Sequence, residues 1–413
     1  MFRTILLYGA DEYLGRLFVA EAVAAWKAPN TPVTYSLIVS GRDAARTQAL
    51  AQQYGLAVRH LDLRQPNQIV QQLDGVDVLV NAASPFADTG VVLAQAAFRA
   101  PCHVVDLNPE VDVFRKLEQL KGDATLAQCA LVRSAGPGAV VSALMVRAAV
   151  ARLKAIDALE ERCIGAVRIG VECVVDFSRS SAASVWRGLA CDVTIMRAVT
   201  IPVPGSPDGR VEMRCDHVPI GMLERQFDFS IDDGTAPLAT DIRIASAAGL
   251  VDTLAASFEI ELNDNLAGTI ESYVSVTTAG RIGYQVGASV GGLCEPVGKT
   301  AFGKNLANCA NGALSDAPSQ AHRLHAHTIV LDIEDEERTR IVDWRLRTPD
   351  FYVVGARTAL AVTEAVAAEA QAGSGFFGLK SPAELLVDVD LAGKIPQYGR
   401  ALRECFIDKR ILQ

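Results

Sequence analysis

The sequence predicts an α/β protein in which a domain with a doubly wound parallel sheet is followed by a second, mixed α+β domain. Two observations predict this. Over residues 1–133, β-prone runs alternate with helical stretches at the spacing of βαβ units, which implies parallel strands joined by crossovers. Beyond residue 136 the chain becomes strand-rich, and its 413 residues are too many for one small core.

The strands of the first domain are expected where short apolar runs are bounded by turn residues, as in buried parallel strands. They are predicted at residues 4–8, 33–39, 58–62, 76–81, 103–106 and 130–132. Helical periodicity lies between these runs and predicts helices at residues 15–26, 44–54, 67–73, 89–100 and 110–128. Each pair of consecutive strands is therefore joined by a helical crossover.

The alternation stops at the turn formed by Gly136, Pro137 and Gly138, and an alanine-rich helix is expected at residues 139–159. The strands after it are predicted at residues 166–176, 193–203, 226–231, 328–334 and 339–345. The remaining periodic segments are a helix at residues 242–256, a small-residue helix or glycine-rich loop at 280–293, a last helix at 358–371, and segments at 381–387 and 399–406.

These patterns divide the chain into three parts. Residues 1–135 are expected to form the first domain, and residues 136–345 a mixed domain that shapes the substrate pocket or a dimer interface. Residues 346–413 are expected to return to the first domain as helices.

Composition argues against several partners and locations. The net charge of −9, with no basic tract to offset it, argues against nucleic acid or an anionic membrane. No apolar run reaches the roughly 20 residues that span a bilayer, and no signal-peptide pattern is found. The nine cysteines are odd in number and lack C-x-x-C spacing, which is typical of reduced thiols. We therefore expect a cytoplasmic protein that binds a small molecule, with a homodimer as a further assembly.

The first strand–turn–helix unit indicates a dinucleotide site. Gly9 opens the turn after the strand and Gly15 starts the helix, so that N–H groups at a helix N-terminus can face a pyrophosphate. The spacing is that of G-x-x-G-x-x-G, but Glu12 replaces the central glycine. Its carboxylate would cap the helix, fill the anion site, or turn to solvent. At ~5 Å and an effective dielectric of ~20, it would cost a bound phosphate roughly 3 kcal/mol.

Several segments, taken in order, are similar to those of one known family. They are residues 9–16, 39–42, 81–86, 103–110, 136–138, 349–359 and 375–383. Together they resemble the saccharopine dehydrogenase-like reductase family. The resemblance implies a Rossmann-like domain that binds NADP, with NAD as the alternative, and hydride transfer to or from a small carbonyl, imine or activated alkene. Glu12 and Ser84 stand where the family pattern has glycines.

The cofactor pocket is expected at the ends of the strands and in the turns after them. Its candidate residues are Gly9, Ala10, Tyr13, Leu14, Gly15, Ser40, Arg42, Asp62, Ala82, Ala83 and Ser84. Arg42 follows the second strand, where an arginine favours a 2′-phosphate and hence NADP. The alternative is an exposed Arg42 paired with Asp43 or Asp62. The family resemblance implies that Asp62 meets the adenine edge.

Few side chains are candidates for catalysis, because the cofactor would carry the chemistry. Asp106 and Asp176 are the candidate proton donors. Asp106 ends a predicted strand at the edge where ligands bind, and an N-cap of the next helix explains it equally well.

Two further interpretations concern metal binding and loss of the cofactor. His322, His325 and His327 form an H-x-x-H-x-H run that leads into an apolar strand without an obvious further ligand before Asp332, so no metal site is expected. The alternative function is that of a family member without cofactor, acting as a non-catalytic binding or scaffold protein.

Overall fold

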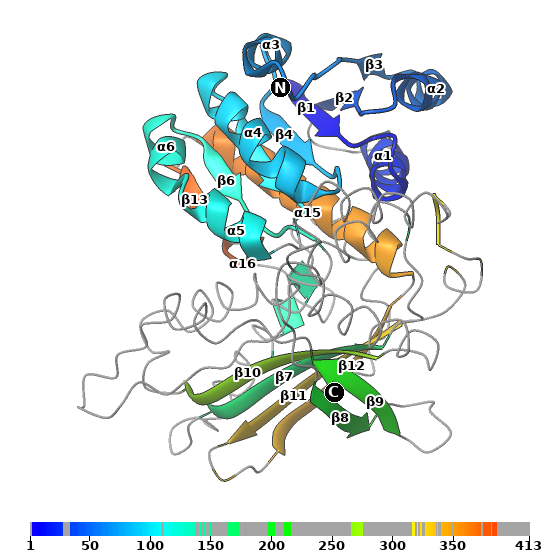
Figure 1. The fold of residues 1–413 in the computed structure, drawn as a ribbon, viewed down its shortest axis with the longest axis vertical. Helices are drawn as coiled ribbons and strands as arrows, with labels where there is room; N and C mark the ends of the chain where they lie inside the picture. The colour runs from blue at the N-terminus through cyan, green and yellow to red at the C-terminus, as the bar shows by residue number, and fades with distance from the viewer. Residues whose placement is uncertain are drawn as a thin grey trace, which may run out of the picture.

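The computed structural model describes most of the first 136 residues and separate segments of the rest. The described segments are residues 2–27, 34–108, 111–136, 164–172, 197–202, 210–215, 266–275, 327–335, 340–348, 350–372, 375–380 and 382–385, with isolated residues in between. Two sheets are formed by these segments (Figure 1).

The first sheet has seven strands, all parallel, in the order β13-β6-β5-β4-β1-β2-β3. Its strands are β1 (Phe2–Tyr8), β2 (Thr34–Ser40), β3 (Ala57–Val58), β4 (Val78–Asn81), β5 (His103–Asp106), β6 (Ala130–Val132) and β13 (Gly378–Lys380). From β1 the chain moves outward to β2 and β3, then returns to β4 on the other side. The order therefore reverses between β1 and β4, which makes this a doubly wound sheet.

Helices cover both faces of this sheet (Figure 1). They are α1 (Tyr13–Trp26), α2 (Ala44–Tyr54), α3 (Pro66–Gln72), α4 (Phe86–Arg99), α5 (Val111–Glu118), α6 (Lys121–Leu126) and, from the C-terminal part, α15 (Phe351–Ala372) and α16 (Pro382–Leu385). The long helix α15 packs against α1 and over β4 and β5. The C-terminal part of the chain thus contributes both a helix and the edge strand β13 to the first sheet.

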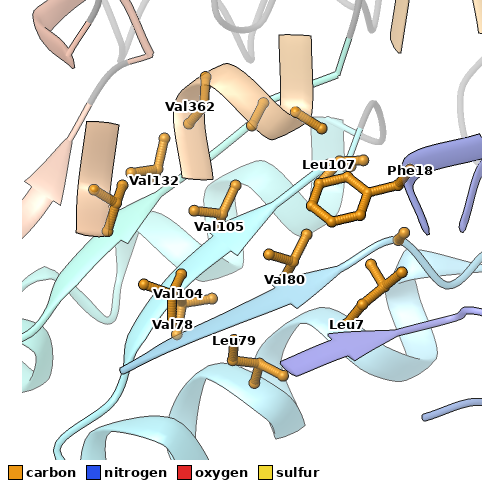
Figure 2. Packing of buried hydrophobic residues seen from close by; sticks show 14 of the residues in the cluster. Leu7, Phe18, Val78, Leu79, Val80, Val104, Val105, Leu107, Val132 and Val362 are labelled. Carbon is orange, nitrogen blue, oxygen red and sulfur yellow. The ribbon is translucent and has the colours of Figure 1, made fainter. Parts of the chain in front are cut away.

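The core of this domain lies between the sheet and its helices. Val80 and Val105 of the central strands, Phe18 of α1 and Val362 of α15 are all fully buried (Figure 2). At roughly 25 cal/mol per Å² of buried apolar surface, such layers supply the main stabilising free energy of the fold. Residues from both ends of the sequence contribute to this core.

Among the described residues, the second sheet has six strands, in the order β12-β11-β7-β10-β9-β8. These are β7 (Ile164–Glu172), β8 (Arg197–Pro202), β9 (Arg210–Cys215), β10 (Leu266–Ser275), β11 (His327–Asp335) and β12 (Arg340–Thr348). β7 and β10 pair in parallel and the other neighbours are antiparallel. The mixed character expected for this part of the chain is therefore present.

The predicted fold class is confirmed, and several element boundaries are corrected. The strand expected at residues 58–62 is only Ala57–Val58, because the Asp62 side chain accepts the Arg64 N–H at 3.1 Å and forms a turn. The helix expected at residues 110–128 is two helices, α5 and α6, and the chain turns at residues 119–120 between them. Both halves keep an apolar face, which hides the break in the sequence.

Other predictions meet the structure only in part. Strands β9, β10 and β13 were not predicted. Residues 140, 141, 144, 145 and 149 are the described members of the expected helix at 139–159, and all are helical. The elements expected at residues 226–231, 242–256, 280–293 and 399–406 lie outside the described residues.

One described helix has the length and apolar content of a membrane span. It covers Phe351–Glu369 within α15. Most of this segment is buried inside the protein, as in the core helix of a globular domain.

Candidate functional site

Three loops meet at the carboxyl edge of the first sheet. They follow β1, β2 and β4 and consist of residues 9–12, 41–43 and 82–85. The strand ends lie side by side, since Tyr8 is in register with Ser40 of β2 and with Asn81 of β4. Because the strand order reverses between β1 and β4, this edge is the topological switch point where open α/β sheets bind ligands.

Gly9 and Gly15 allow the first loop to pack closely against its neighbours. Gly9 has a φ of +95°, which glycine adopts without steric cost. A Cβ on Gly9 would lie 2.7 Å from the backbone nitrogen of Ala83, and a Cβ on Gly15 would lie 2.0 Å from the carbonyl oxygen of Gly9. Both glycines therefore serve contacts within the protein. Glu12 lies between them as the N-cap residue of α1.

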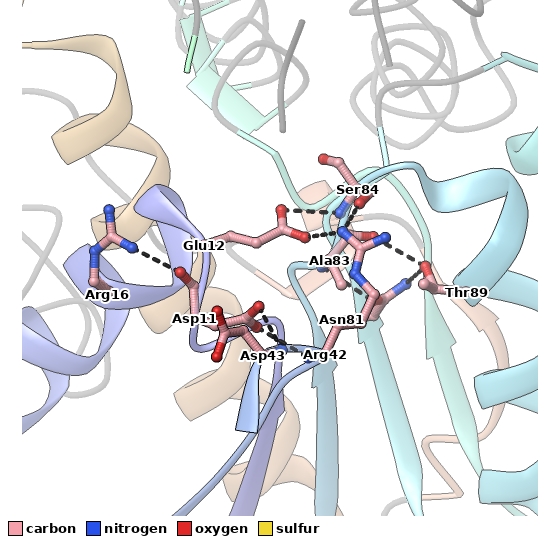
Figure 3. Close-up of polar contacts among 9 residues, drawn as sticks. All are labelled: Asp11, Glu12, Arg16, Arg42, Asp43, Asn81, Ala83, Ser84 and Thr89. Atoms are coloured by element: carbon pink, nitrogen blue, oxygen red, sulfur yellow. Dashed lines mark hydrogen bonds and ion pairs between the residues drawn. The ribbon is translucent and has the colours of Figure 1, made fainter. Parts of the chain in front are cut away.

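Glu12 points from the start of α1 to the loop after β4 (Figure 3). Its Oε2 accepts a hydrogen bond from the Ser84 N–H at 3.1 Å, and its Oε1 pairs with the guanidinium of Arg42. The side chain is only 7% exposed and makes no capping hydrogen bond. Of the three predicted orientations, capping and turning to solvent are wrong. The carboxylate lies among the donors of the expected anion site.

Burial raises the pKa of Glu12 to about 7, although the Arg42 charge and the Ser84 N–H oppose the shift. The charge of the neighbouring Asp11 carboxylate raises this pKa further. Tyr8 lies at the same edge, and burial raises the pKa of its phenol to about 12. Glu12 therefore changes charge near neutral pH, whereas Tyr8 stays a neutral phenol.

Asp11 brings a second carboxylate to the neighbouring loop. Its Oδ1 accepts the Arg42 N–H at 3.2 Å and its Oδ2 accepts the Asp43 N–H at 3.1 Å (Figure 3). Gly41 is required for this contact, because a Cβ there would lie 2.0 Å from Asp11 Oδ1. In dinucleotide-binding folds the loop after the second strand meets the adenosine ribose. Asp11 thus holds two backbone donors of the loop expected to bind that ribose.

Arg42 connects the loop after β2 with the loop after β4. Its guanidinium donates hydrogen bonds to the Glu12 carboxylate and to the carbonyl oxygen of Ser84. The side chain is 44% exposed, so it remains accessible from solvent while it holds the buried Glu12. Arg42 is therefore a positively charged group that a ligand from solvent can reach.

The alternative pairing of Arg42 with Asp43 or Asp62 is wrong. Asp43 pairs with Arg46 at 3.3 Å, and Asp62 pairs with Arg64 at 2.9 Å. Hydrogen bonds from Arg64 hold the pKa of Asp62 well below its usual range. The hydrogen bonds found for Asp62 therefore stay within its own turn.

A buried network of hydrogen bonds holds the loop after β4 in place. The Asn81 amide donates to Asp106 Oδ2 at 2.7 Å and to Thr89 Oγ1 at 3.0 Å, and Thr89 donates to the carbonyl of Ala83 at 3.0 Å. Asp106 Oδ1 accepts the Asn108 N–H at 3.0 Å, and Asp106 is 1% exposed. This network fixes the loop whose next N–H group holds Glu12.

The remaining predicted site residues differ in their placement. Ala10 donates its N–H to the carbonyl of Ser40 at 3.0 Å, which ties the first loop to β2. The Tyr13 ring packs edge-on against Tyr352 of α15, with centroids 5.2 Å apart. The other members pack within or against the core; they are Leu14, Ala82 and Ala83. The predicted residues that lie outside the described part of the chain are Asp176, His322 and His325.

Two residues of the site were not assigned a role from the sequence. Asp11 has no predicted role, and Asn81 lies in the segment 81–86 that resembles the family without a role of its own. The sequence could have identified Asn81, because it is a polar residue that ends an apolar strand at the ligand-binding edge. The sequence could not have identified Asp11, because its partners, the N–H groups of Arg42 and Asp43, belong to a loop about 30 residues away.

The donors of this site fit a dinucleotide such as NADP. A guanidinium and backbone N–H groups, as on Arg42, Asp43 and Ser84, are ordinary phosphate ligands. The hydroxyl of Ser40, buried at the end of β2, has no hydrogen-bond partner among the described residues. The two carboxylates, of Asp11 and Glu12, instead compete with a phosphate for these donors. The site therefore fits NADP in its donors while it contains two internal competitors.

Comparisons with known proteins show what the chain is similar to. Residues 13–140 match the family model of the saccharopine dehydrogenase NADP binding domain. Apo saccharopine dehydrogenase (L-Glu forming) from Saccharomyces cerevisiae is similar over 97% of this chain and 96% of its own, at 15% identity and a TM-score of 0.49. The DAP dehydrogenase of C. glutamicum, in complex with DAP, is similar over 94% and 97%, at 15% identity and a TM-score of 0.40. No curated protein sequence matches the chain.

The family match begins at Tyr13, directly after the turn that holds Asp11 and Glu12. It covers α1 and every strand from β2 to β6, which includes the Arg42 and Ser84 loops. Residues 13–140 are thus similar to the saccharopine dehydrogenase NADP binding domain, as the resemblance in the sequence implied.

Proposed function

We propose that the chain is an NADP-dependent oxidoreductase that transfers a hydride to or from a small carbonyl, imine or activated alkene. The observation that carries this proposal is the convergence of the Gly9 turn, the Arg42 loop and the Ser84 loop at one switch point. The match of residues 13–140 to an NADP binding domain supports it.

The residues of this chain would bind and orient the cofactor. Arg42 would take the 2′-phosphate, because it follows β2 and is 44% exposed. The N–H groups at the start of α1, together with that of Ser84, would face the diphosphate. When bound, the nicotinamide supplies or accepts the hydride. The protein would otherwise exclude water and fix the two partners in contact.

Proton transfer would involve Asp176 rather than Asp106. A proton donor must come within hydrogen-bond distance of the substrate. Both oxygens of Asp106 already accept hydrogen bonds, from Asn81 and from Asn108, and the side chain is 1% exposed. Asp106 would therefore position the loop after β4. Asp176, outside the described residues, stays the proposed donor.

A fluorescence titration with NADPH and NADH tests the cofactor and its 2′-phosphate contact. The intact chain is expected to bind NADPH, and Arg42→Ala is expected to weaken NADPH about 10- to 100-fold, as loss of a charge-assisted phosphate contact does, with little effect on NADH. Arg99→Ala is a matched control, because Arg99 is an exposed arginine at the end of α4, which leads to the opposite edge of the sheet. Equal losses for the two nucleotides would contradict the role of Arg42.

The contacts of Glu12 favour a second candidate function. A family member that has lost the cofactor would act as a binding or scaffold protein, with a homodimer as its assembly. Its internal carboxylates would then replace the ligand permanently. The same titration separates the two functions. Binding of NADPH by Glu12→Gly but not by the intact chain supports the scaffold, and tight binding by the intact chain rules it out.

A further inference from the structure

The hydrogen-bond donors of the site are held by two carboxylates, those of Asp11 and Glu12, which belong to the same turn. Glu12 holds the Arg42 guanidinium and the Ser84 N–H, while Asp11 holds the N–H groups of Arg42 and Asp43. Both carboxylates are buried, at 9% exposure each. An anionic group therefore already lies at the ribose loop and another lies at the start of α1.

A phosphate cannot bind to the backbone N–H groups of Ser84, Arg42 and Asp43 without displacing a carboxylate, because each is a single donor already in use. The guanidinium of Arg42 has donors for a second anion, but its Nη2 already donates to Glu12 and to the Ser84 carbonyl, so a phosphate that takes this nitrogen must displace Glu12. The Ser84 N–H is a single donor, and Glu12 uses it. Arg42 is free to leave, because its side chain is half-exposed, whereas Glu12 is enclosed by the loops and stays behind.

We infer that Glu12 is a built-in competitor of the cofactor's phosphates, which yields Arg42 and the Ser84 N–H to the ligand and takes up a proton as it does so. This inference rests on the proposed function, since it describes how the NADP site would open.

The groups that face Glu12 determine its charge in the two states. Arg42 from the loop after β2 and the Ser84 N–H favour its carboxylate, while Asp11 from its own turn disfavours it and Tyr8 at the end of β1 stays neutral. Transfer of Arg42 and the Ser84 N–H to a phosphate removes the two favourable contacts and adds a negative neighbour. Both changes raise the pKa of Glu12 above its value of about 7 in the ligand-free site.

The sign of the pH dependence follows from this change. Below pH 7, Glu12 is mostly protonated before the ligand binds, so little proton uptake accompanies binding. Above pH 7, binding must protonate a carboxylate, so affinity falls with rising pH by up to about tenfold per pH unit, the limit for one proton. The ligand's own phosphate, whose second pKa is about 6, is fully ionised in that range and adds no such dependence.

The experiment measures NADPH binding by calorimetry at pH 7.0 to 8.5, in two phosphate-free buffers of different ionisation heat. The buffer dependence of the heat gives the number of protons taken up. The intact chain is expected to take up close to one proton at pH 8, and Glu12→Gln is expected to take up none. Glu12→Gln is also expected to bind at least tenfold more tightly at pH 8. Asp74→Asn, an exposed carboxylate in the loop before β4, is the control and should match the intact chain.

The outcomes separate this inference from the proposed function. NADPH binding by the intact chain with no proton uptake, and with the same affinity in Glu12→Gln, overturns the inference and leaves the proposed function standing. Binding by Glu12→Gln but not by the intact chain supports the competitor and overturns the proposed use of NADP. Absence of binding by the intact chain, Glu12→Gln and Glu12→Gly alike overturns both.

Discussion

Asp106 shows how one carboxylate at the ligand edge acts through its neighbours. It accepts hydrogen bonds from the Asn81 amide and the Asn108 N–H in a buried place. Asp106→Asn replaces one acceptor by a donor, so one of these partners loses its bond. We expect a loss of about 1–3 kcal/mol in the free energy of unfolding, measured by urea denaturation.

Asp74→Asn is the control for this change, since Asp74 is exposed and should lose nothing measurable. A stable Asp106→Asn protein that lacks turnover would contradict the positioning role and make Asp106 the proton donor. A positioning role therefore predicts a lower free energy of unfolding, whereas a role as proton donor predicts a loss of turnover without a loss of stability.

Glu12 marks the limit of prediction from the sequence at the scale of a residue. The G-x-x-G-x-x-G spacing was enough to place Glu12 at the expected anion site. This spacing could not predict which of three orientations the Glu12 side chain adopts, because the groups that bind its carboxylate lie far away in the sequence. Arg42 is 30 residues away and Ser84 is 72 residues away. Only the fold brings these partners to the carboxylate.

At the scale of elements, the contact of α1 with the end of β1 depends on Gly15. A methyl group there would lie 2.0 Å from the carbonyl oxygen of Gly9, and backbone cannot yield as a flexible side chain can. Gly15→Ala is therefore expected to lower the free energy of unfolding by about 1–3 kcal/mol or more, despite the better helix propensity of alanine.

Gly122→Ala in α6 is the matched comparison. Among the described residues nothing lies within 4 Å of a Cβ built there, so helix propensity alone should raise the unfolding free energy by up to ~1 kcal/mol. Thermal melts of the two variants provide the measurement. A Gly15→Ala protein as stable as the intact chain would show that α1 can move away from the sheet at no cost.

The strands that could be predicted are those whose own residues form an apolar run between turns. The apolar runs of β5 and β6 were predicted at their observed bounds, because each is enclosed by turn residues. Strand β13 was missed, since three residues, Gly378–Lys380, contain no periodicity. Its pairing with β6 links positions about 250 residues apart. Such a short strand forms because it can pair with β6 at the edge of the sheet.

At the scale of the molecule, the first sheet is completed by the two ends of the described chain. A fragment of residues 1–136 would contain every strand of this sheet except β13, but it would lack α15. The apolar face over β4 and β5 would then be open to water. We expect this fragment to bind a hydrophobic dye and to melt without a cooperative transition, because the uncovered part of the sheet exposes an apolar patch.

Joining residues 1–136 to residues 346–413 through a long flexible linker should restore cooperative melting and abolish dye binding, because Val362 and its neighbours on α15 again cover the buried face that includes Val105. Dye fluorescence and near-ultraviolet circular dichroism during heating measure both effects. Cooperative melting of the 1–136 fragment on its own would mean that α15 is dispensable. The linked protein also contains the proposed NADPH site without the second sheet, so its cofactor affinity tests whether the three loops at the switch point suffice to bind NADPH.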